Sequence, residues 1–230
     1  MHCYEFHELE YSAPRVWNSY KHLLNSEVRG FGYFAWKPEL IHNTLKEQKL
    51  DLDLVIWADA GCEINRNIVS ETIFKKSIMN AIKRGYYFYD LDYPERQYTK
   101  ASLLYQFPDV SPESNQIQAT YLMISAKYLE VAEEWMNIVL AKLSNIDLTE
   151  SCDGEQSDFK EHRFDQSVLS LVVKKRGLEI SKSRPPGGIK TLKSLCKSIV
   201  SPIWTVRNRT GQSARNELLL RYWRDLFRIN

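Results

Sequence analysis

The sequence of 230 residues contains no apolar run approaching the ~20 residues that a membrane-spanning helix needs. Its first ten residues, MHCYEFHELE, include neither a basic start nor an apolar stretch, so we expect no secretory signal. The four cysteines are widely spaced and form no CxxC pair, a pattern that favours free thiols over disulfides. Together these absences predict a protein of the reducing cytoplasm.

Several common catalytic signatures are absent as well. The sequence has no HExxH, P-loop or GxGxxG motif and no arrangement typical of a Ser-His-Asp triad. The five histidines have no metal-ligand spacing, which argues against a histidine-based metal site. Any chemistry is therefore expected from carboxylates, amides and basic side chains.

The bulk composition is that of a globular chain, with 43% apolar and 26% charged residues and enough length for one domain with a full core. The net charge of +2 hides an asymmetry. Residues 181–230 contain eleven Lys or Arg against two acids, a net of +9, so the preceding residues carry −7. A basic segment attached to an acidic body predicts contact with a polyanion.

The basic segment follows a turn signal, RPPGGIK, which predicts a division into a domain at 1–183 and a tail at 184–230. Within the tail, NELLLRYWRDLFRI places its apolar residues on one helical face beside arginines. We expect a basic amphipathic helix that lies in an anionic membrane surface, with packing against the domain as the alternative. No nucleic-acid-binding module accompanies the charge, so nucleic acid is not expected as a partner.

The remaining sequence alternates between two periodicities. Apolar residues at helical spacing predict helices over 15–24, 36–45, 73–82 (with Gly85 as its C-cap), 127–143 and 165–175. Short apolar runs predict strands over 54–58, 86–90 and 119–125. The first of these strands is continuously apolar, which predicts burial on both of its faces. Strands that alternate with helices indicate an α/β layered domain.

Acidic residues follow the strand at 54–58, in the stretch VIWADAGCEIN. Ligands of open α/β sheets bind outside the carboxyl ends of strands, so Asp59 is well placed for a site. Ala60 and Gly61 remove bulk, which lets a large ligand approach the backbone. Asp59 and Glu63 together would supply oxygen ligands to a hard divalent cation. An ordinary surface turn is the alternative interpretation.

A second cluster of polar residues lies in EHRFDQSVLSLV, residues 161–172. Asp165 is suited to be the N-cap of the predicted helix, which would explain it without any function. His162, Arg163 and Gln166 add further hydrogen-bonding groups at the same helix entrance. Capping needs only one of them, so the density favours a polyhydroxylated or phosphorylated ligand.

Two further stretches contain candidate ligand-binding groups. RGFGYFAWKP (29–38) combines two glycines with Lys37 and predicts a tight turn that presents a cation, with a core segment as the alternative. RQYTKASL (96–103) offers Thr99 as a helix N-cap. Beside it, Lys100 is more simply explained by a solvated helix start than by a ligand.

Taken in order, GFGYFAWKP, VIWADAGCEIN, YTK, NQIQATYLMIS and HRFDQSVLSLV give a specific resemblance over roughly residues 29–180. The chain resembles bacterial glycosyltransferases of the GT-A fold that build surface polysaccharide or lipopolysaccharide. The resemblance implies a GT-A-like, Rossmann-like mixed sheet flanked by helices. It also implies transfer of a sugar from a nucleotide-sugar donor, UDP-linked by preference, to a cell-surface glycan or lipid-linked acceptor.

The same resemblance implies roles for individual residues. Asp59-Ala60-Gly61 takes the place of the DxD motif, where acids bind the donor ribose and a Mn²⁺ or Mg²⁺ on the diphosphate. Because its third position is Gly, the second metal-binding Asp is absent, and either Glu63 substitutes for it or the metal is held by other groups. Asp165 would hydrogen-bond the donor sugar or act as a base, with Gln166 near the anomeric carbon. The other residues expected at the donor are Lys37, Arg29, Gln116, Gln118, His162 and Arg163.

One departure from the family favours a second interpretation. GT-A domains usually begin with a strand and loop that hold the nucleotide base, and this first βα unit is not recognisable here. A degenerate domain that only binds, as a partner subunit in glycan assembly, is therefore the alternative to an active enzyme. With the basic tail, either function predicts a peripheral location at the inner face of the plasma membrane.

Overall fold

The computed structural model describes residues 8–48, 54–64, 68–151, 154–181 and 203–204. The predicted amphipathic helix of the tail therefore lies outside the described residues. Within the described part, no helix combines the length and apolarity needed to cross a membrane.

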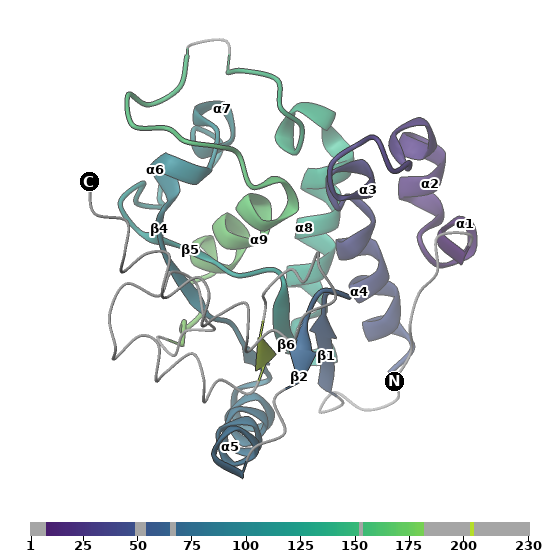
Figure 1. Ribbon diagram of the computed structural model, residues 1–230, viewed down its shortest axis with the longest axis vertical. Coiled ribbons are helices and arrows are strands. Elements are labelled where there is room, and N and C mark those ends of the chain that lie inside the picture. The colour runs from purple at the N-terminus through teal and green to yellow at the C-terminus, as the bar shows by residue number, and fades with distance from the viewer. Residues whose placement is uncertain (1–7, 49–53, 65–67, 152–153, 182–202, 205–230) are drawn as a thin grey trace, which may run out of the picture.

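The described elements begin with helices, and beyond residue 53 short strands are interspersed with helices along the chain (Figure 1). The helices and 3₁₀ turns are α1 (Leu9–Ser12), α2 (Pro14–Tyr20), η2 (Lys21–Leu23), α3 (Gly30–Tyr33), α4 (Trp36–Lys46), α5 (Ile68–Arg84), α6 (Glu95–Tyr98), α7 (Ala101–Leu104), η3 (Ala126–Tyr128), α8 (Leu129–Ala141), η4 (Leu143–Asn145) and α9 (Phe164–Lys175). The strands are β1 (Leu54–Ala58), β2 (Glu63–Ile64), β3 (Tyr86–Tyr87), β4 (Asp90–Pro94), β5 (Asn115–Ile117), β6 (Tyr121–Ser125) and β7 (Ile203–Trp204).

Strand β6 is the centre of the fold. It lies between β1 and β3 and pairs with both in antiparallel register. Because successive side chains of a strand point to opposite faces, Leu122 and Ile124 enter the larger core, which α4, α8 and α9 complete. Tyr121 and Met123 enter a smaller cluster with Ala81 of α5. The sheet is therefore covered on both faces, and α5 is the helix that covers the second face within the described residues (Figure 1).

The prediction of an α/β domain is confirmed, whereas the expected mixed sheet is not what the described strands form. They pair antiparallel in three small sheets, β1-β6-β3, β2-β7 and β4-β5. A parallel contact occurs only as an isolated bridge between Tyr89 and Ser181, within the residues described. The predicted strand at 86–90 is divided, since β3 ends at Tyr87 and β4 begins at Asp90.

The predicted burial of residues 54–58 on both faces is wrong. Among the described strands β1 pairs with β6 alone, and Ile56 is 42% exposed. All five residues of β6 are buried instead. The edge strand β1 (LVIWA) is wholly apolar, whereas the central strand β6 (YLMIS) includes a serine, so composition does not reveal which of the two strands is central.

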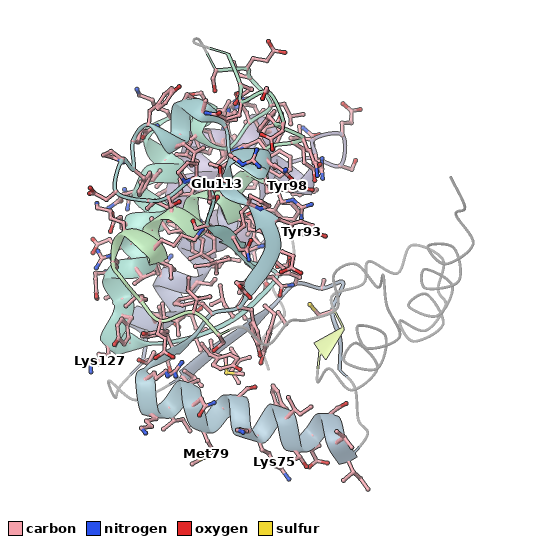
Figure 2. The ribbon with its side chains drawn as sticks, turned by 90° about the vertical axis from the view of Figure 1, so that its left-hand side faces the viewer. Lys75, Met79, Tyr93, Tyr98, Glu113 and Lys127 are labelled. Atoms are coloured by element: carbon pink, nitrogen blue, oxygen red, sulfur yellow. The ribbon has the colours of Figure 1, made fainter. Side chains whose placement is uncertain are left out.

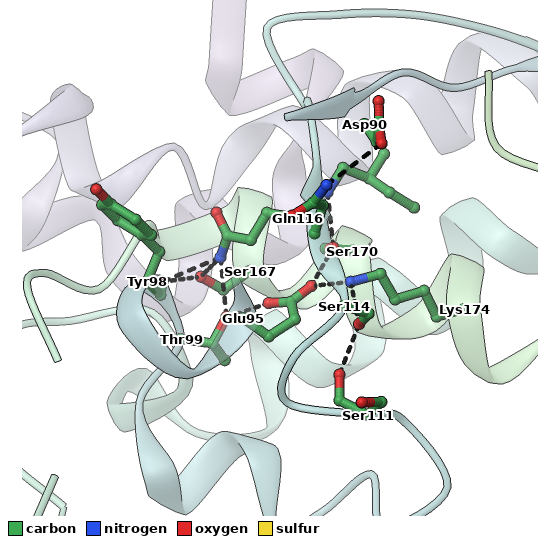
Figure 3. Close-up of polar contacts among 12 residues, drawn as sticks. Asp90, Glu95, Tyr98, Thr99, Ser111, Ser114, Gln116, Ser167, Ser170 and Lys174 are labelled. Atoms are coloured by element: carbon green, nitrogen blue, oxygen red, sulfur yellow. Dashed lines mark hydrogen bonds and ion pairs between the residues drawn. The ribbon is translucent and has the colours of Figure 1, made fainter. Parts of the chain in front are cut away.

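A buried polar network joins α9 to residues 95–99 and 114–116 of the same chain (Figure 3). The Glu95 carboxylate is fully buried and accepts hydrogen bonds from Thr99 Oγ1 at 2.5 Å, Lys174 Nζ at 2.5 Å and Ser170 Oγ. Thr99 is thus not the N-cap predicted for it; Lys100 holds the N-cap position of α7. Removing one partner would leave an uncompensated buried charge, so this network ties α9 firmly to the fold.

We predict that Gly85→Ala destabilises the protein more than Gly177→Ala. Both glycines have positive φ (87° and 63°), which costs alanine about 1 kcal/mol at either site. An added Cβ at Gly85 would lie 2.6 Å from the Tyr128 ring, whereas the space at Gly177 is open. Urea unfolding should show a further loss of about 1–3 kcal/mol for Gly85→Ala. Equal losses would contradict the packing described for Tyr128.

Candidate functional site

The chain before α4 follows an unusual backbone path. Phe31, Tyr33 and Phe34 all have positive φ values, between 56° and 60°, which is strained for aromatic residues. Gly30 and Gly32 also have positive φ, and a Cβ on Gly30 would lie 2.2 Å from the Phe34 ring. The RGFGYF stretch thus forms the predicted tight turn, which leads directly into the first turn of α4.

A second strained residue faces this turn. Phe164, the first residue of α9, has φ of 50°, and its ring lies 5.4 Å from the ring of Tyr33 and 6.4 Å from that of Phe34. The N-cap of α9 is Arg163 rather than Asp165, so the predicted capping role of Asp165 is wrong. Strained backbone of this kind persists only where surrounding contacts over-determine it, and it is common at functional sites.

Lys37 joins the three segments that carry the main motifs. Its Nζ lies 3.1 Å from Asp59 Oδ1 and 3.2 Å from Asp165 Oδ2. The Lys37 side chain is only 2% exposed, and the Phe34 ring lies 4.9 Å from Nζ. Trp57 Nε1 donates a hydrogen bond to the same oxygen, Asp59 Oδ1, at 2.8 Å. The turn, the strand end and the helix start therefore converge on one ammonium group.

Burial changes the proton affinity of these groups. Desolvation raises the pKa of Asp165 to about 6; the charge of Lys37 opposes this rise and that of Asp59 adds to it. Burial disfavours the charge of Lys37, but the two carboxylates outweigh that effect and raise its pKa. An ammonium and two carboxylates leave one excess negative charge above the pKa of Asp165. The site is thus electrostatically suited to a group that becomes positive.

The amide of Gln166 is held from both ends. Its Nε2 donates to Gln116 Oε1 at 2.8 Å, and its Oε1 accepts from the backbone N–H of Ala119 at 3.4 Å. Gln116 Nε2 in turn donates to Thr99 Oγ1 and Ser167 Oγ. Gln166 therefore lies beside Asp165 with its orientation set by the buried network. Gln118 is also buried, at 4% exposure.

His162 lies outside this convergence and is used internally. Its Nε2 contacts the carbonyl of Asn145 at 2.8 Å, and its Nδ1 accepts from the backbone N–H of Lys100 at 3.3 Å. Burial, and then the charge of Lys100, lower the pKa of His162 to about 3, so the ring is neutral. Lys100 is itself buried against Asp147 and Thr149, which contradicts the predicted solvated helix start.

Two arginines lie around the start of α9. Arg29 is 48% exposed, pairs with Glu161 at 3.4 Å and lies 5.0 Å from the Phe164 ring. The Arg163 guanidinium lies 4.7 Å from the Tyr93 ring and 4.6 Å from the Tyr98 ring, whose labels are adjacent in Figure 2. Arg163 also pairs with Glu161, at 3.0 Å, so the two arginines and this carboxylate leave one excess positive charge at the start of α9, the helix that contributes Asp165 to the ion triad of Lys37, Asp59 and Asp165.

The predicted metal site is not tested by the described residues, because the side chain of Glu63, its second expected ligand, lies outside them. The described residues include no group of three or more His, Cys, Asp or Glu side chains able to hold an ion. Asp59 and Asp165 already share the Lys37 ammonium. Ala60 and Gly61 are exposed beside Asp59, so the turn itself is accessible.

Sequence reasoning missed two features of the site. Trp57 is two residues before Asp59, and side chains two residues apart along a strand lie on the same face. The contact between Trp57 and Asp59 could therefore have been predicted from the sequence. The pairing of β2 with β7, Glu63 with Trp204 and Ile64 with Ile203, brings residues 203–204 beside the acidic turn. Two residues of strand carry no recognisable pattern, so no sequence signal was available for it.

Comparison with protein-family models, with curated proteins and with solved structures finds no match to this chain.

We predict that Asp165 makes stability fall as pH rises from about 4 to about 6. A carboxyl whose pKa is raised on folding keeps its proton in the folded state after the unfolded chain has lost it. The fall should reach at most about 3 kcal/mol and stop above about pH 6. Urea unfolding of wild type and Asp165→Asn across this range measures it as the difference between the two proteins.

The difference is needed because His162, with its lowered pKa, contributes the opposite slope in both proteins. Asp109→Asn, at an exposed acid, is the matched control and should keep the wild-type profile. Parallel profiles for wild type and Asp165→Asn would contradict the raised pKa.

Proposed function

We propose that this protein is a glycosyltransferase that moves a sugar from a nucleotide-sugar donor, UDP-linked by preference, to a cell-surface glycan or lipid-linked acceptor. The observation that carries the proposal is the convergence of Asp59 and Asp165 on Lys37. These residues come from three separate motifs of the resemblance, and a fold without a common site has no need to bring them together. The finer assignment to a GT-A-like fold is part of the same proposal.

In this proposal Asp165 is the proton acceptor. A general base works best when its pKa lies near the working pH, and the pKa of about 6 for Asp165 meets that requirement. The acceptor hydroxyl oxygen bonds to the anomeric carbon and passes its proton to Asp165, while the bond from that carbon to the diphosphate breaks. The excess negative charge of the ion triad stabilises the positive charge that develops on the sugar.

The departing diphosphate is stabilised by the chain's own cations. The side chain of Glu63, the second expected metal ligand, lies outside the described residues, so no step is assigned to a metal. The Lys37 ammonium offsets one of the two carboxylates of the triad, so the positive charge for the diphosphate comes from Arg29 and Arg163 at the start of α9, whose two charges exceed that of Glu161. Preorganised cations of this kind act without a reorganisation cost during the reaction.

One observation favours the alternative of a domain that only binds. The Lys37 side chain is almost fully buried, and its two carboxylate partners satisfy its charge within the protein. Such a triad also serves as a purely structural clamp. The alternative is then a degenerate GT-A domain that acts as a partner subunit in glycan assembly.

Donor turnover separates these two functions. We expect wild type to release UDP from at least one member of a UDP-sugar panel, and Asp165→Asn to reduce that rate by about 100-fold or more. Release is measured by chromatography of the free nucleotide. Asp109→Asn removes an exposed acid of the same type and should leave the rate unchanged.

If wild type turns over no UDP-sugar, a thermal-shift measurement of UDP binding distinguishes the remaining explanations. Wild type that binds UDP but hydrolyses no donor would support the binding-only subunit. Wild type that neither binds nor hydrolyses would reject both. Full activity of Asp165→Asn would reject the base role given to Asp165.

We also expect turnover to survive removal of divalent metal. Lys37 already supplies the positive charge between Asp59 and Asp165, so EDTA should change the rate by less than about twofold. The assay compares EDTA-treated enzyme with and without added MnCl₂. A loss of about tenfold or more that Mn²⁺ restores would overturn the role given to Lys37.

A further inference from the structure

Helix α5 presents one narrow face to the protein. Its buried residues are Ser70, Ser77 and Ala81, and it contacts β3 and β6 of the sheet. These small side chains allow the helix to lie close to the strands. The 17 residues span about 25 Å, so the opposite face forms a long edge of the described domain.

That opposite face carries large apolar side chains. Ile68 is 83% exposed, Met79 64% and Ile82 44%. Ile68 and Met79 are eleven residues apart, close to three turns of ~3.6 residues, so they lie on the same line along the helix. Figure 2 shows Met79 projecting from α5 on the side turned away from the rest of the described domain. No other described element covers these three side chains.

Cations flank the apolar line. Lys75, Lys76 and Lys83 are all exposed, and Figure 2 shows Lys75 projecting on the same side as Met79. Glu71 is the one acid of α5, and it pairs with Lys75 at 2.9 Å. The combination of an apolar centre and lysines on a single helix face is the signature of a helix that lies in a membrane interface.

Charge decides between the possible occupants of this face. A second copy that met α5 with its own α5 would bring lysines against lysines, which is unfavourable. The tail of this chain, with eleven Lys or Arg against two acids after residue 180, has the wrong sign as well. An anionic surface complements the lysines and accepts the apolar side chains between them.

We propose that α5 docks on anionic lipid bilayers, with Ile68, Met79 and Ile82 in the interface and Lys75, Lys76 and Lys83 on the headgroups. This site is separate from the ion triad and from the predicted tail, and the proposal does not depend on the proposed catalytic function. It gives the domain itself a contact with the membrane.

Co-sedimentation of the full chain with vesicles tests the proposal. The vesicles contain about 30% phosphatidylserine in phosphatidylcholine, or phosphatidylcholine alone. Because each lysine near an anionic surface contributes roughly fivefold in affinity, Lys75→Gln/Lys76→Gln/Lys83→Gln should weaken binding by about a hundredfold. Added salt should weaken wild-type binding in the same direction.

The matched control is Lys21→Gln/Lys46→Gln/Lys142→Gln, which removes the same charge from exposed positions on other elements. It should bind like wild type. A second variant, Ile68→Ser/Met79→Ser/Ile82→Ser, keeps every charge and should also lose affinity. All six residues changed on α5 are exposed, so thermal unfolding should be unaltered.

Unchanged vesicle binding in both α5 variants would overturn the proposal and assign the membrane contact to the tail. Equal weakening by the control triple variant would also overturn it, because net charge alone would then explain binding. Concentration-dependent dimers that only the α5 variants lose, measured by light scattering, would assign this face to a second copy instead. Donor turnover is measured without vesicles, so its outcome is independent of these results.

Discussion

The ammonium group of Lys37 holds together three segments that are distant in the sequence. Two carboxylates approach it from β1 and α9, and an aromatic turn covers it from the side of α4. A buried cation of this kind is stable only while its partners stay in place. The same packing keeps Phe34 and Phe164 at positive φ, since their rings contact each other across the site. Geometry and strain at the site are therefore mutually dependent.

Behind this ion triad lies a second polar layer that fixes α9 against the strands. The amide of Gln166 donates a hydrogen bond to Gln116, which in turn donates to Thr99. Thr99 and Lys174 both donate to the Glu95 carboxylate. Gln166, Gln116, Thr99 and Glu95 are all buried, and an unsatisfied polar group would be costly there. This layer explains why α9, which is buried over most of its length, contains polar residues. They orient the start of α9 toward Lys37.

Much of this arrangement could be predicted from local sequence patterns. The periodicity that predicted helices at 36–45, 127–143 and 165–175 corresponds to α4, α8 and α9 with small shifts at the ends. The turn in GFGYF and the placement of Asp59 at the end of a strand also follow from local chemistry, because glycine spacing and an apolar run are local signals. These motifs contained the three charged groups of the site.

Long-range features were not predictable in the same way. Apolar runs do not specify pairing direction, so the antiparallel order and the edge position of β1 were missed. The capping role given to Asp165 was wrong because its carboxylate is held by Lys37, a partner more than a hundred residues away. Similarly, the backbone N–H of Lys100 contacts the ring of His162, 62 residues away in the sequence. The burial of these two residues could not be predicted from the sequence around either of them.

The central position of β6 has a consequence for how this chain tolerates changes in length. Alternate residues of β6 belong to different cores, so a single inserted or deleted residue within it would exchange the occupants of both. Two hydrophobic layers would then be mismatched at once, along with the register of both adjoining strands. Insertions and deletions should accordingly be tolerated better in exposed loops, where side chains do not alternate between two cores.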